Sequence, residues 1–281
     1  MHPMKTVSFA EDLELSVLGQ GTWRLGDAAD RRDTEIRALR TGIDLGMTVI
    51  DTAELYGSGR SERLVGEAIS ACRDEVTLVS KVMPSNASRR GTIEACERSL
   101  KHLDTDRIDL YLLHWLGAEP LGDTFEAFEE LRAAGKIRHW GVSNLDREDL
   151  DKALDLAPEG TLVANQLYYS LEERGIEYRF IDQMRERSVG IMAYTPLGDS
   201  KSLLADSTVR AIAAEHGATP AQIALAFVLR QDNLCALVKA GSPDHVRENA
   251  AAGEIELTRD DLDRLDRAFP PPTRRQPLAI I

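Results

Sequence analysis

The sequence is short of cysteine and has no long apolar run, and both shortages narrow what the chain can be. Its cysteines are Cys72, Cys96 and Cys235, an odd number without a Cys-x-x-Cys pair. This pattern argues against a disulfide framework or a zinc site, and it fits a reducing cytosol. The longest clean apolar run, residues 223–229, is far shorter than the roughly 20 residues of a membrane span. Residues 1–12 contain no apolar core of a signal peptide. We therefore expect a cytoplasmic protein with no metal and no membrane segment.

Positive charge is also scarce. Lys and Arg number 34 against 47 Asp and Glu, which gives a formal net charge of −13. An acidic balance disfavours nucleic acid and anionic membrane surfaces as partners. It does not exclude a small anionic cofactor, because a local group of lysines and backbone amides can bind one inside an acidic protein.

The rest of the composition is that of an ordinary soluble protein, with 43% hydrophobic and 29% charged residues over 281 positions. Barrels of alternating strands and helices reach about 250 residues as one domain. Because neither a linker nor a low-complexity segment interrupts the chain, we predict one domain over residues 1–281. The proline-rich end, from Pro270 onward, is predicted to be a surface tail.

Short strand-like runs alternate with segments of helical periodicity along the chain. The start is predicted to be a β-hairpin of Lys5–Phe9 and Leu13–Ser16. The predicted strands that follow cover residues 47–51, 76–81, 108–114, 137–142, 162–166, 190–194, 234–239 and, weakly, 254–256. The predicted helices cover residues 34–45, 61–71, 92–103, 124–134, 147–156, 176–187, 207–216, 220–229 and 258–268. Thr219 and Pro220 have the pattern of a helix start, and Gly135 and Gly190 that of residues following a helix end.

Strands that alternate with helices indicate parallel βαβ units. About eight such units close into a barrel. We therefore predict a (β/α)8 TIM barrel preceded by a β-hairpin. Periodicity alone leaves a doubly wound open sheet as the alternative.

Catalytic groups of such barrels lie at the carboxyl ends of the strands. Polar or aromatic residues fall at or just after these ends at Asp51, Tyr56, Lys81, His114, Trp115, Ser143, Asn144, Asn165, Gln166, Tyr194 and Lys239.

Four of these residues have the character of an acid site for a carbonyl compound. A free tyrosine has a pKa of about 10, and an ammonium group such as that of Lys81 would lower the pKa of Tyr56. Asp51 would keep Lys81 protonated, and His114 would hydrogen-bond a carbonyl oxygen. Such a group can stabilise an oxyanion and then protonate it, which suits hydride addition to a C=O bond.

Each of the four residues also has an ordinary structural explanation when it is taken alone. An Asp at a strand end often caps a helix, and a loop Tyr often packs against its neighbours. A Lys commonly keeps its head in water, and a lone His is more often a core residue than a catalytic one. The functional interpretation therefore depends on their joint placement.

Residues 50–62, IDTAELYGSGRSE, resemble the first signature of the aldo-keto reductase family. The resemblance covers nearly the whole chain in the family's order, through GQGTW (19–23), SLKHLDTDRIDLYLLHW (99–115), GKIRHWGVSN (135–144), NQ (165–166), AYTPLG (193–198) and KAGSPDHVREN (239–249). It implies the same barrel with an N-terminal hairpin, and the chain is most similar to small bacterial reductases of methylglyoxal and related aldehydes.

The resemblance implies a catalytic tetrad of Asp51, Tyr56, Lys81 and His114. In it Tyr56 is the general acid, Lys81 lowers its pKa, Asp51 supports Lys81, and His114 orients the substrate. The implied substrate contacts are Trp23, Tyr56, His114 and Trp115. The implied reaction is the NADPH-dependent reduction of small aldehydes and ketones, such as methylglyoxal and aromatic aldehydes.

The implied cofactor is NADPH. Ser143, Asn144 and Gln166 match residues that hydrogen-bond the nicotinamide carboxamide, and Tyr194 matches the ring that stacks on the nicotinamide. The other implied cofactor contacts are Gly21, Thr22, Trp23, Asp51, Thr195, Pro196, Leu197, Lys239, Ala240, Gly241, His245 and Asn249. The chain has no Gly-x-Gly-x-x-Gly motif after a strand, which argues against a Rossmann site.

The site implied for the 2′-phosphate departs from the family pattern. Many members have Lys-Ser followed five residues later by Arg, whereas this chain has Lys239-Ala240 and then His245. The change removes a hydroxyl donor and replaces a guanidinium by a titratable imidazole. We therefore expect a preference for NADPH that is relaxed enough to admit NADH.

The predicted loops on the catalytic face are short, which implies an open pocket for small or varied carbonyl compounds. A nicotinamide-binding barrel that serves as a redox sensor or regulatory subunit is the main alternative. A metal-dependent hydrolase would need more His and carboxylate ligands at the strand ends than His114 and Asp51. The family resemblance favours a monomer.

Overall fold

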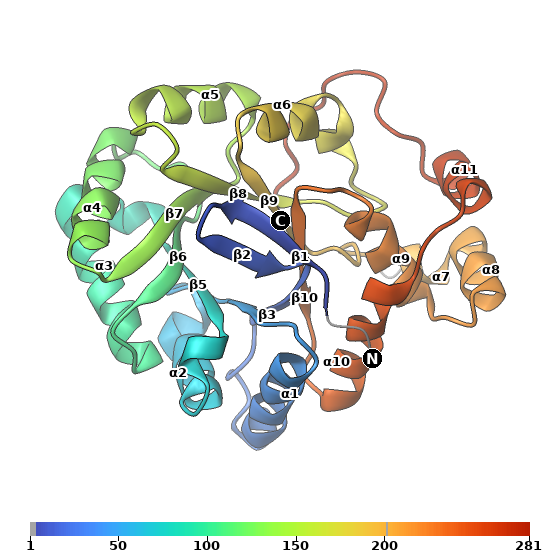
Figure 1. Cartoon of the computed structure of the whole chain (residues 1–281), viewed down its shortest axis with the longest axis horizontal. Helices are drawn as coiled ribbons and strands as arrows, with labels where there is room; N and C mark the ends of the chain where they lie inside the picture. The colour runs from blue at the N-terminus through green and yellow to red at the C-terminus, as the bar shows by residue number, and fades with distance from the viewer. Residues whose placement is uncertain (1–3, 201) are drawn as a thin grey trace.

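The computed structural model describes residues 4–200 and 202–281. Residues 1–3, part of the segment expected to lack a signal peptide, lie outside this description, as does residue 201 in the short 197–205 connection. Within the described residues, eight parallel strands close into a barrel in the order β10-β3-β4-β5-β6-β7-β8-β9. Helices surround it, as Figure 1 shows. The predicted TIM barrel is therefore confirmed, and the open sheet is excluded.

The strands and helices follow the predicted alternation closely. The barrel strands are β3 (Leu18–Gly21), β4 (Val49–Asp51), β5 (Thr77–Val82), β6 (Ile108–Leu113), β7 (Ile137–Ser143), β8 (Leu162–Tyr168), β9 (Gly190–Tyr194) and β10 (Leu234–Lys239). The helices are α1 (Arg32–Asp44), α2 (Arg60–Ile69), α3 (Arg89–Leu103), α4 (Leu121–Ala133), α5 (Arg147–Leu156), α6 (Phe180–Glu186), α7 (Ser202–Ala205), α8 (Ser207–Glu215), α9 (Pro220–Leu229), α10 (Pro243–Ala251) and α11 (Arg259–Ala268).

One strand prediction was wrong, and the error lies in which segment closes the barrel. The segment predicted as a weak last strand begins with the end of a 3-10 helix, η6 (Ala252–Glu254), and continues as irregular chain. The eighth strand is instead β3, which pairs with both β10 and β4. Its sequence, Leu-Gly-Gln-Gly, lacks the β-branched residues typical of strands. A Cβ atom at Gly19 would lie 2.8 Å from Leu237 Cδ2 and 3.0 Å from Val49 Cβ, so a side chain there would force its neighbours to move.

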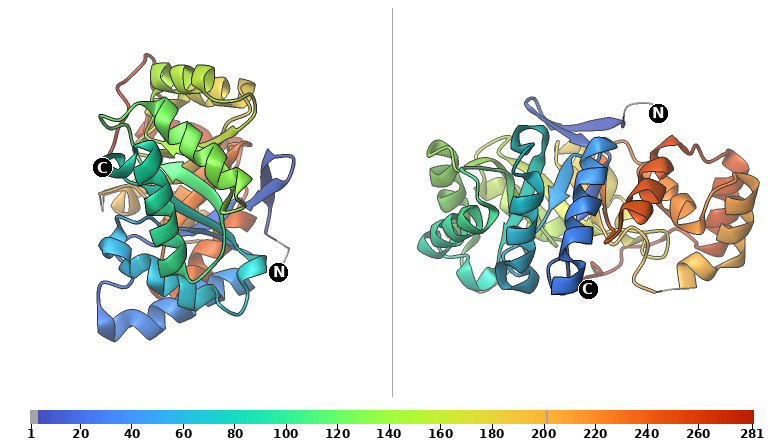
Figure 2. Two further views of the ribbon diagram at one scale, coloured as in Figure 1. Left: turned by 90° about the vertical axis from the view of Figure 1, so that its left-hand side faces the viewer. Right: turned by 90° about the horizontal axis from the view of Figure 1, so that it is seen from below.

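The predicted hairpin is confirmed and closes the amino-terminal end of the barrel. β1 (Thr6–Ala10) pairs antiparallel with β2 (Leu13–Ser16). Its apolar residues join the side chains that fill the barrel interior, and Phe9 lies so close to Gly190 that a side chain on that glycine would overlap the ring. Gly190 is the first residue of β9 and does not cap the preceding helix. The left-handed residue that follows this helix is Ser188, with a φ of 55°. Figure 2 shows the hairpin and the C-terminus at opposite ends of the barrel.

Two other predicted boundaries are confirmed. Thr219 caps α9 with a reciprocal capping box to Gln222, and Pro220 opens the helix. Gly135 follows α4 with a left-handed φ of 73°.

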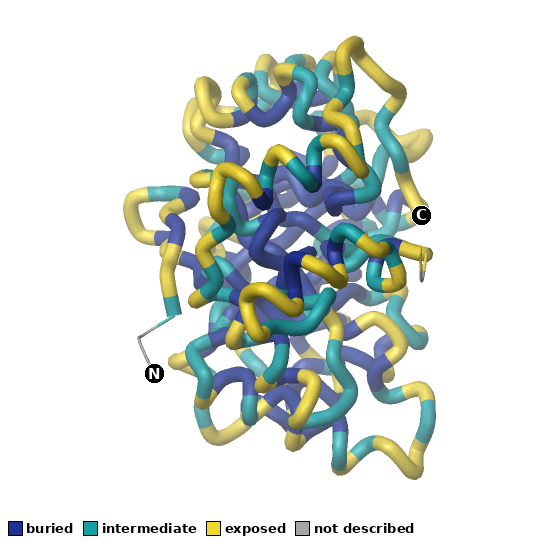
Figure 3. Tube along the Cα trace, turned by 90° about the vertical axis from the view of Figure 1, so that its right-hand side faces the viewer, coloured by how far each residue is buried: buried dark blue, intermediate teal, exposed yellow. Residues whose placement is uncertain are grey.

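The main apolar core lies between the barrel and its helices, so that the strands are buried on both faces. Figure 3 shows this buried centre within exposed outer turns. Of the helices in residues 4–200 and 202–281, none combines the length and the apolar character needed to traverse a bilayer. In the same part of the chain, no group of three or more His, Cys, Asp or Glu is arranged to hold a metal ion.

Candidate active site

A cavity of about 960 Å³ opens at the carboxyl ends of the barrel strands. Most of the predicted site residues line it. These are Gly21, Thr22, Trp23, Asp51, Tyr56, His114, Trp115, Ser143, Asn144, Gln166, Tyr194, Thr195, Pro196, Leu197 and Lys239. Lys81 lies buried next to the cavity, in contact with Asp51 and Tyr56. Ala240, Gly241, His245 and Asn249 lie beyond the lining, along the connection from β10 into α10.

Part of the cavity wall was not predicted from the sequence. The additional lining residues are Leu55, Leu116, Gly198, Asp199, Leu237, Val238, Ile280 and Ile281. Leu55 and Leu116 directly follow or precede predicted site residues, so adjacency was a usable signal for them. The two isoleucines had no such signal, because the path of an irregular tail cannot be read from local periodicity.

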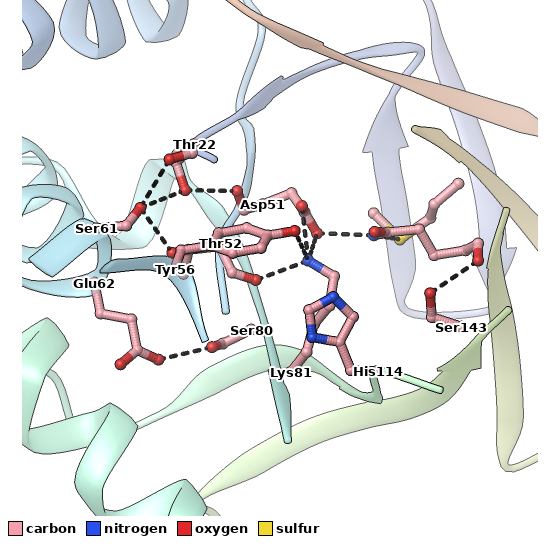
Figure 4. Close-up of polar contacts among 12 residues, drawn as sticks. Thr22, Asp51, Thr52, Tyr56, Ser61, Glu62, Ser80, Lys81, His114 and Ser143 are labelled. Atoms are coloured by element: carbon pink, nitrogen blue, oxygen red, sulfur yellow. Dashed lines mark hydrogen bonds and ion pairs between the residues drawn. The ribbon is translucent and has the colours of Figure 1, made fainter. Parts of the chain in front are cut away.

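Asp51 and Lys81 form a buried ion pair under the cavity floor. They stand on the neighbouring parallel strands β4 and β5, whose register brings their ends together. Lys81 Nζ lies 2.8 Å from both carboxylate oxygens of Asp51 and donates to Thr52 O at 2.8 Å (Figure 4). The Lys81 side chain is fully buried, and that of Asp51 is 5% exposed. A buried charge is tolerated only with such pairing, so each residue depends on the other.

The pair keeps Lys81 charged. Burial by itself lowers the pKa of Lys81, but the negative charge of Asp51, the nearby Tyr56 and their hydrogen bonds outweigh it and hold the pKa above its ordinary value. The ammonium group is therefore a fixed positive charge beside the cavity at physiological pH.

Tyr56 brings its hydroxyl to this charge. Lys81 Nζ donates to Tyr56 Oη at 3.3 Å, as Figure 4 shows. Tyr56 begins a tight turn, η2 (Tyr56–Gly59), in which Gly57 and Gly59 have φ of 57° and 82°. Glycine adopts this left-handed conformation without steric cost. The glycines of the YGSG segment therefore place the tyrosine ring at the cavity wall before α2 starts.

The pKa of Tyr56 corrects one expectation from the sequence. Burial raises the pKa of Tyr56, Lys81 lowers it, and Asp51 raises it again, so that the outcome lies above the ordinary value. Lys81 thus lowers the pKa of Tyr56 as predicted. Without a bound ligand, the removal of the phenol from water raises this pKa by more than Lys81 lowers it.

His114 stands at the end of β6 next to the Tyr56 ring. The two rings meet edge to face with centroids 5.8 Å apart, and the Trp115 ring also contacts His114, with centroids 4.6 Å apart. Burial lowers the pKa of His114 to about 3, and the charge of Lys81 adds to this effect. His114 is therefore neutral at physiological pH, a state suited to donating a hydrogen bond rather than carrying charge.

A group of hydroxyls behind the tetrad was not found from the sequence. Ser61, in the first turn of α2, shares its one hydroxyl proton between Thr22 O at 3.0 Å and Thr22 Oγ1 at 2.8 Å. Thr22 Oγ1 donates to Asp51 O at 2.9 Å, and Thr52 Oγ1 donates to Ser61 at 3.2 Å. These bonds tie the loop after β3 and the start of α2 to the strand end that carries Asp51.

A row of amide and hydroxyl groups crosses the cavity next to the tetrad. Ser143 Oγ donates to Gln166 O at 2.9 Å, and Gln166 Nε2 donates to Asp51 Oδ1 at 2.8 Å. Asn144, held at a left-handed φ of 59°, donates to His114 O at 3.2 Å and accepts from Tyr194 Oη at 2.9 Å. The row offers donors and acceptors complementary to a carboxamide. The Tyr194 ring, stacked on Tyr168 at 5.7 Å, lines the same cavity.

The residues predicted for the far end of the site lie where β10 leads into α10. Lys239 ends β10 with its side chain exposed, and Ser242 caps α10 by accepting the backbone N–H of His245 at 3.4 Å. His245 is exposed on the first turn. Asn249 is 5% exposed, so it is a buried amide and not a surface one.

Comparison with known proteins identifies the same architecture elsewhere. Residues 17–269 match the model of the Aldo/keto reductase family. The methylglyoxal reductase YeaE of Escherichia coli is 43% identical over 99% of both chains. A crystal structure of an aldo/keto reductase from Klebsiella pneumoniae in complex with NADP and acetate superposes with a TM-score of 0.95, at 46% identity, over 99% of this chain and 100% of that one. A second Klebsiella pneumoniae structure, in complex with NADPH, has the same identity and TM-score and covers 99% of each chain.

Proposed function

The chain belongs to the aldo/keto reductase family, and we propose that it reduces small aldehydes and ketones to alcohols with NADPH and with Tyr56 as the proton donor. The observation that carries this proposal is the 3.3 Å contact between Tyr56 Oη and the buried Lys81 ammonium. A phenol that gives up its proton at this position leaves a phenolate beside a fixed positive charge. The ammonium group thereby reduces the free-energy cost of forming a buried phenolate when Tyr56 gives up its proton.

The state of His114 supports the choice of Tyr56 as the acid. With a pKa of about 3, His114 has no imidazolium proton to give at neutral pH. Its neutral ring instead supplies a hydrogen bond that holds the carbonyl oxygen near the Tyr56 hydroxyl. The two groups would share the charge that develops on this oxygen in the transition state.

The cavity contains residues that fit a nicotinamide cofactor. When bound, NADPH supplies the hydride. Ser143, Asn144 and Gln166 would hold its carboxamide, and Tyr194 would support one face of the ring so that the other faces the substrate. The remaining contacts proposed for the cofactor are Gly21, Thr22, Trp23, Asp51, Thr195, Pro196, Leu197, Lys239, Ala240, Gly241, His245 and Asn249.

Substrate size and polarity are set at the rim of the cavity. Trp23, Leu55, Ile280 and Ile281 are 55%, 39%, 57% and 59% exposed although all are large and apolar. All four line the same cavity. An exposed apolar patch of this kind marks a binding surface. It supports small carbonyl compounds with an apolar side, such as aromatic aldehydes, with methylglyoxal as a compact member of the same class. Trp23 and Trp115 would contact them.

The test is cofactor oxidation followed at 340 nm, with NADPH and then NADH, against methylglyoxal and an aromatic aldehyde. We expect turnover with NADPH, and slower turnover with NADH. Tyr56→Phe removes one hydroxyl and should abolish turnover while it leaves cofactor affinity nearly unchanged. An equal loss of turnover and cofactor binding would contradict the proton-donor role. Clear cofactor binding without turnover by the unmodified protein would instead favour a redox sensor or a regulatory subunit.

A further inference from the structure

A guanidinium group from another part of the barrel reaches the connection between β10 and α10. Arg31 ends the 3-10 helix η1 (Ala29–Arg31), immediately before α1. Helices α1 and α10 pack side by side, as Figure 1 shows. A Cβ atom on Gly241 would lie 3.3 Å from Arg31 Nη2. The guanidinium therefore sits directly over the backbone at Gly241, two residues after Lys239.

A buried carboxylate lies within ion-pair distance of Arg31. The side chain of Glu35 is 3% exposed, and its Oε1 lies 3.9 Å from Arg31 Nε. The other oxygen of Glu35 accepts the backbone N–H of Gly26 at 2.9 Å, which fixes the carboxylate in the loop before α1. Arg31 itself is 60% exposed, so the rest of its guanidinium remains accessible to a ligand.

The surroundings favour an anion. Lys239 is exposed at the end of β10, and α10 begins at Pro243 with the positive end of its dipole toward the same connection. Asp244 opposes this charge, but it is 94% exposed and is paired with Arg247 at 2.9 Å. Gly241 has no side chain, and a Cβ atom there would lie 3.3 Å from Arg31 Nη2 and 4.0 Å from Glu35 Oε1. The negative charge of Glu35 therefore faces the same backbone and is offset by the guanidinium of Arg31.

We propose that Arg31, positioned by Glu35, is the second cationic ligand of the adenosine 2′-phosphate, together with Lys239. The inference depends on the proposed use of NADPH. Lys239 supplies a point charge, whereas the guanidinium of Arg31 supplies two parallel N–H donors that match phosphate oxygens. Position 245, an arginine in the family pattern, is a histidine in this chain, and Arg31 would supply a guanidinium at Gly241 instead.

The experiment measures dissociation constants of NADPH and NADH by quenching of protein fluorescence, with no substrate present. Arg31→Leu should raise the dissociation constant of NADPH about tenfold, as expected for one charge-assisted contact, and should change that of NADH less than about twofold. Arg32→Leu is the matched control. Arg32 is the adjacent arginine and pairs with Glu67 of α2, so its loss should affect neither constant. Adenosine 2′,5′-bisphosphate and 5′-AMP serve as competing ligands that lack the nicotinamide. Arg31→Leu should weaken the binding of the bisphosphate and leave that of 5′-AMP nearly unchanged.

The outcomes separate this inference from the function on which it depends. The unmodified protein could bind NADPH more tightly than NADH, and Arg31→Leu could keep the same ratio of dissociation constants. That result would refute the role of Arg31 and leave the proposed function standing. Equal weakening of both cofactors by Arg31→Leu would also overturn this role, because the residue would then act on the fold. An unmodified protein that binds neither cofactor would refute the proposed function and the inference together.

Discussion

The pKa of His114 predicts a measurable cost in acid stability. The folded pKa is about 3, whereas an exposed histidine has a pKa of about 6.5. As the pH falls below about 6.5, the unfolded chain takes up a proton at this position and the folded chain does not. The stability that neutral His114 contributes is therefore complete above the unfolded pKa and is lost as the pH falls toward about 3.

The size of the effect follows from the gap between the two pKa values. Each pH unit below the unfolded pKa costs about 1.4 kcal/mol until the folded pKa is reached. At about pH 4.5 the loss is therefore roughly 3 kcal/mol relative to pH 7. The whole gap between about 3 and the ordinary 6.5 corresponds to nearly 5 kcal/mol. Because His114 is only 8% exposed, solvent screening does not reduce this figure much.

The assay is urea unfolding of the unmodified protein and of His114→Gln, each at pH 7 and at about pH 4.5. Other titrating groups are common to both proteins, so they cancel in the difference between the two pH dependences. His114→Gln should lose roughly 3 kcal/mol less on acidification than the unmodified protein. If the two proteins lose the same free energy to within about 0.5 kcal/mol, His114 is not kept neutral by burial, and the argument that excludes it as the acid fails.

Two further substitutions test the ion pair and the phosphate site. Lys81→Met should abolish turnover and lower the free energy of unfolding by about 3–5 kcal/mol, because Asp51 is left buried without its partner. Urea unfolding measures this loss, and Asp51→Asn in the same protein should recover part of it; no recovery would contradict the pairing argument. Lys239→Ala should weaken NADPH much more than NADH in a direct binding titration, and equal weakening would show that Lys239 is not a ligand of the 2′-phosphate.

Three of the residues proposed as catalytic could be predicted from the sequence because they follow a rule of the fold. Asp51, Lys81 and His114 each end or follow a buried apolar run, and parallel strands bring such ends to one face of the barrel. The prediction needed no knowledge of side-chain conformation. Their proximity in the structure follows from register alone.

The features that escaped prediction depend on tertiary contacts. β3 contains two glycines and a glutamine whose amide donates to Leu39 O at 3.1 Å and Met47 O at 3.0 Å, so its sequence reflects close packing rather than strand propensity. The pKa of Tyr56 depends on how far the ring is withdrawn from water, which no spacing of residues encodes. The roles of individual site residues, the single domain and the monomeric, cytoplasmic state stay predictions.

Part of the cavity rim comes from the tail that follows α11 and not from the barrel itself. Residues 270–281 form no helix or strand, and Arg275 fastens them to Asp146 and Glu148 at the start of α5. Their last side chains, Ile280 and Ile281, then reach the wall that a substrate would touch. Because this segment carries none of the barrel's hydrogen-bond ladder, its sequence can vary without disturbing the tetrad. Substitutions in the tail should therefore change the shape of the cavity rim and leave Asp51, Tyr56, Lys81 and His114 in place.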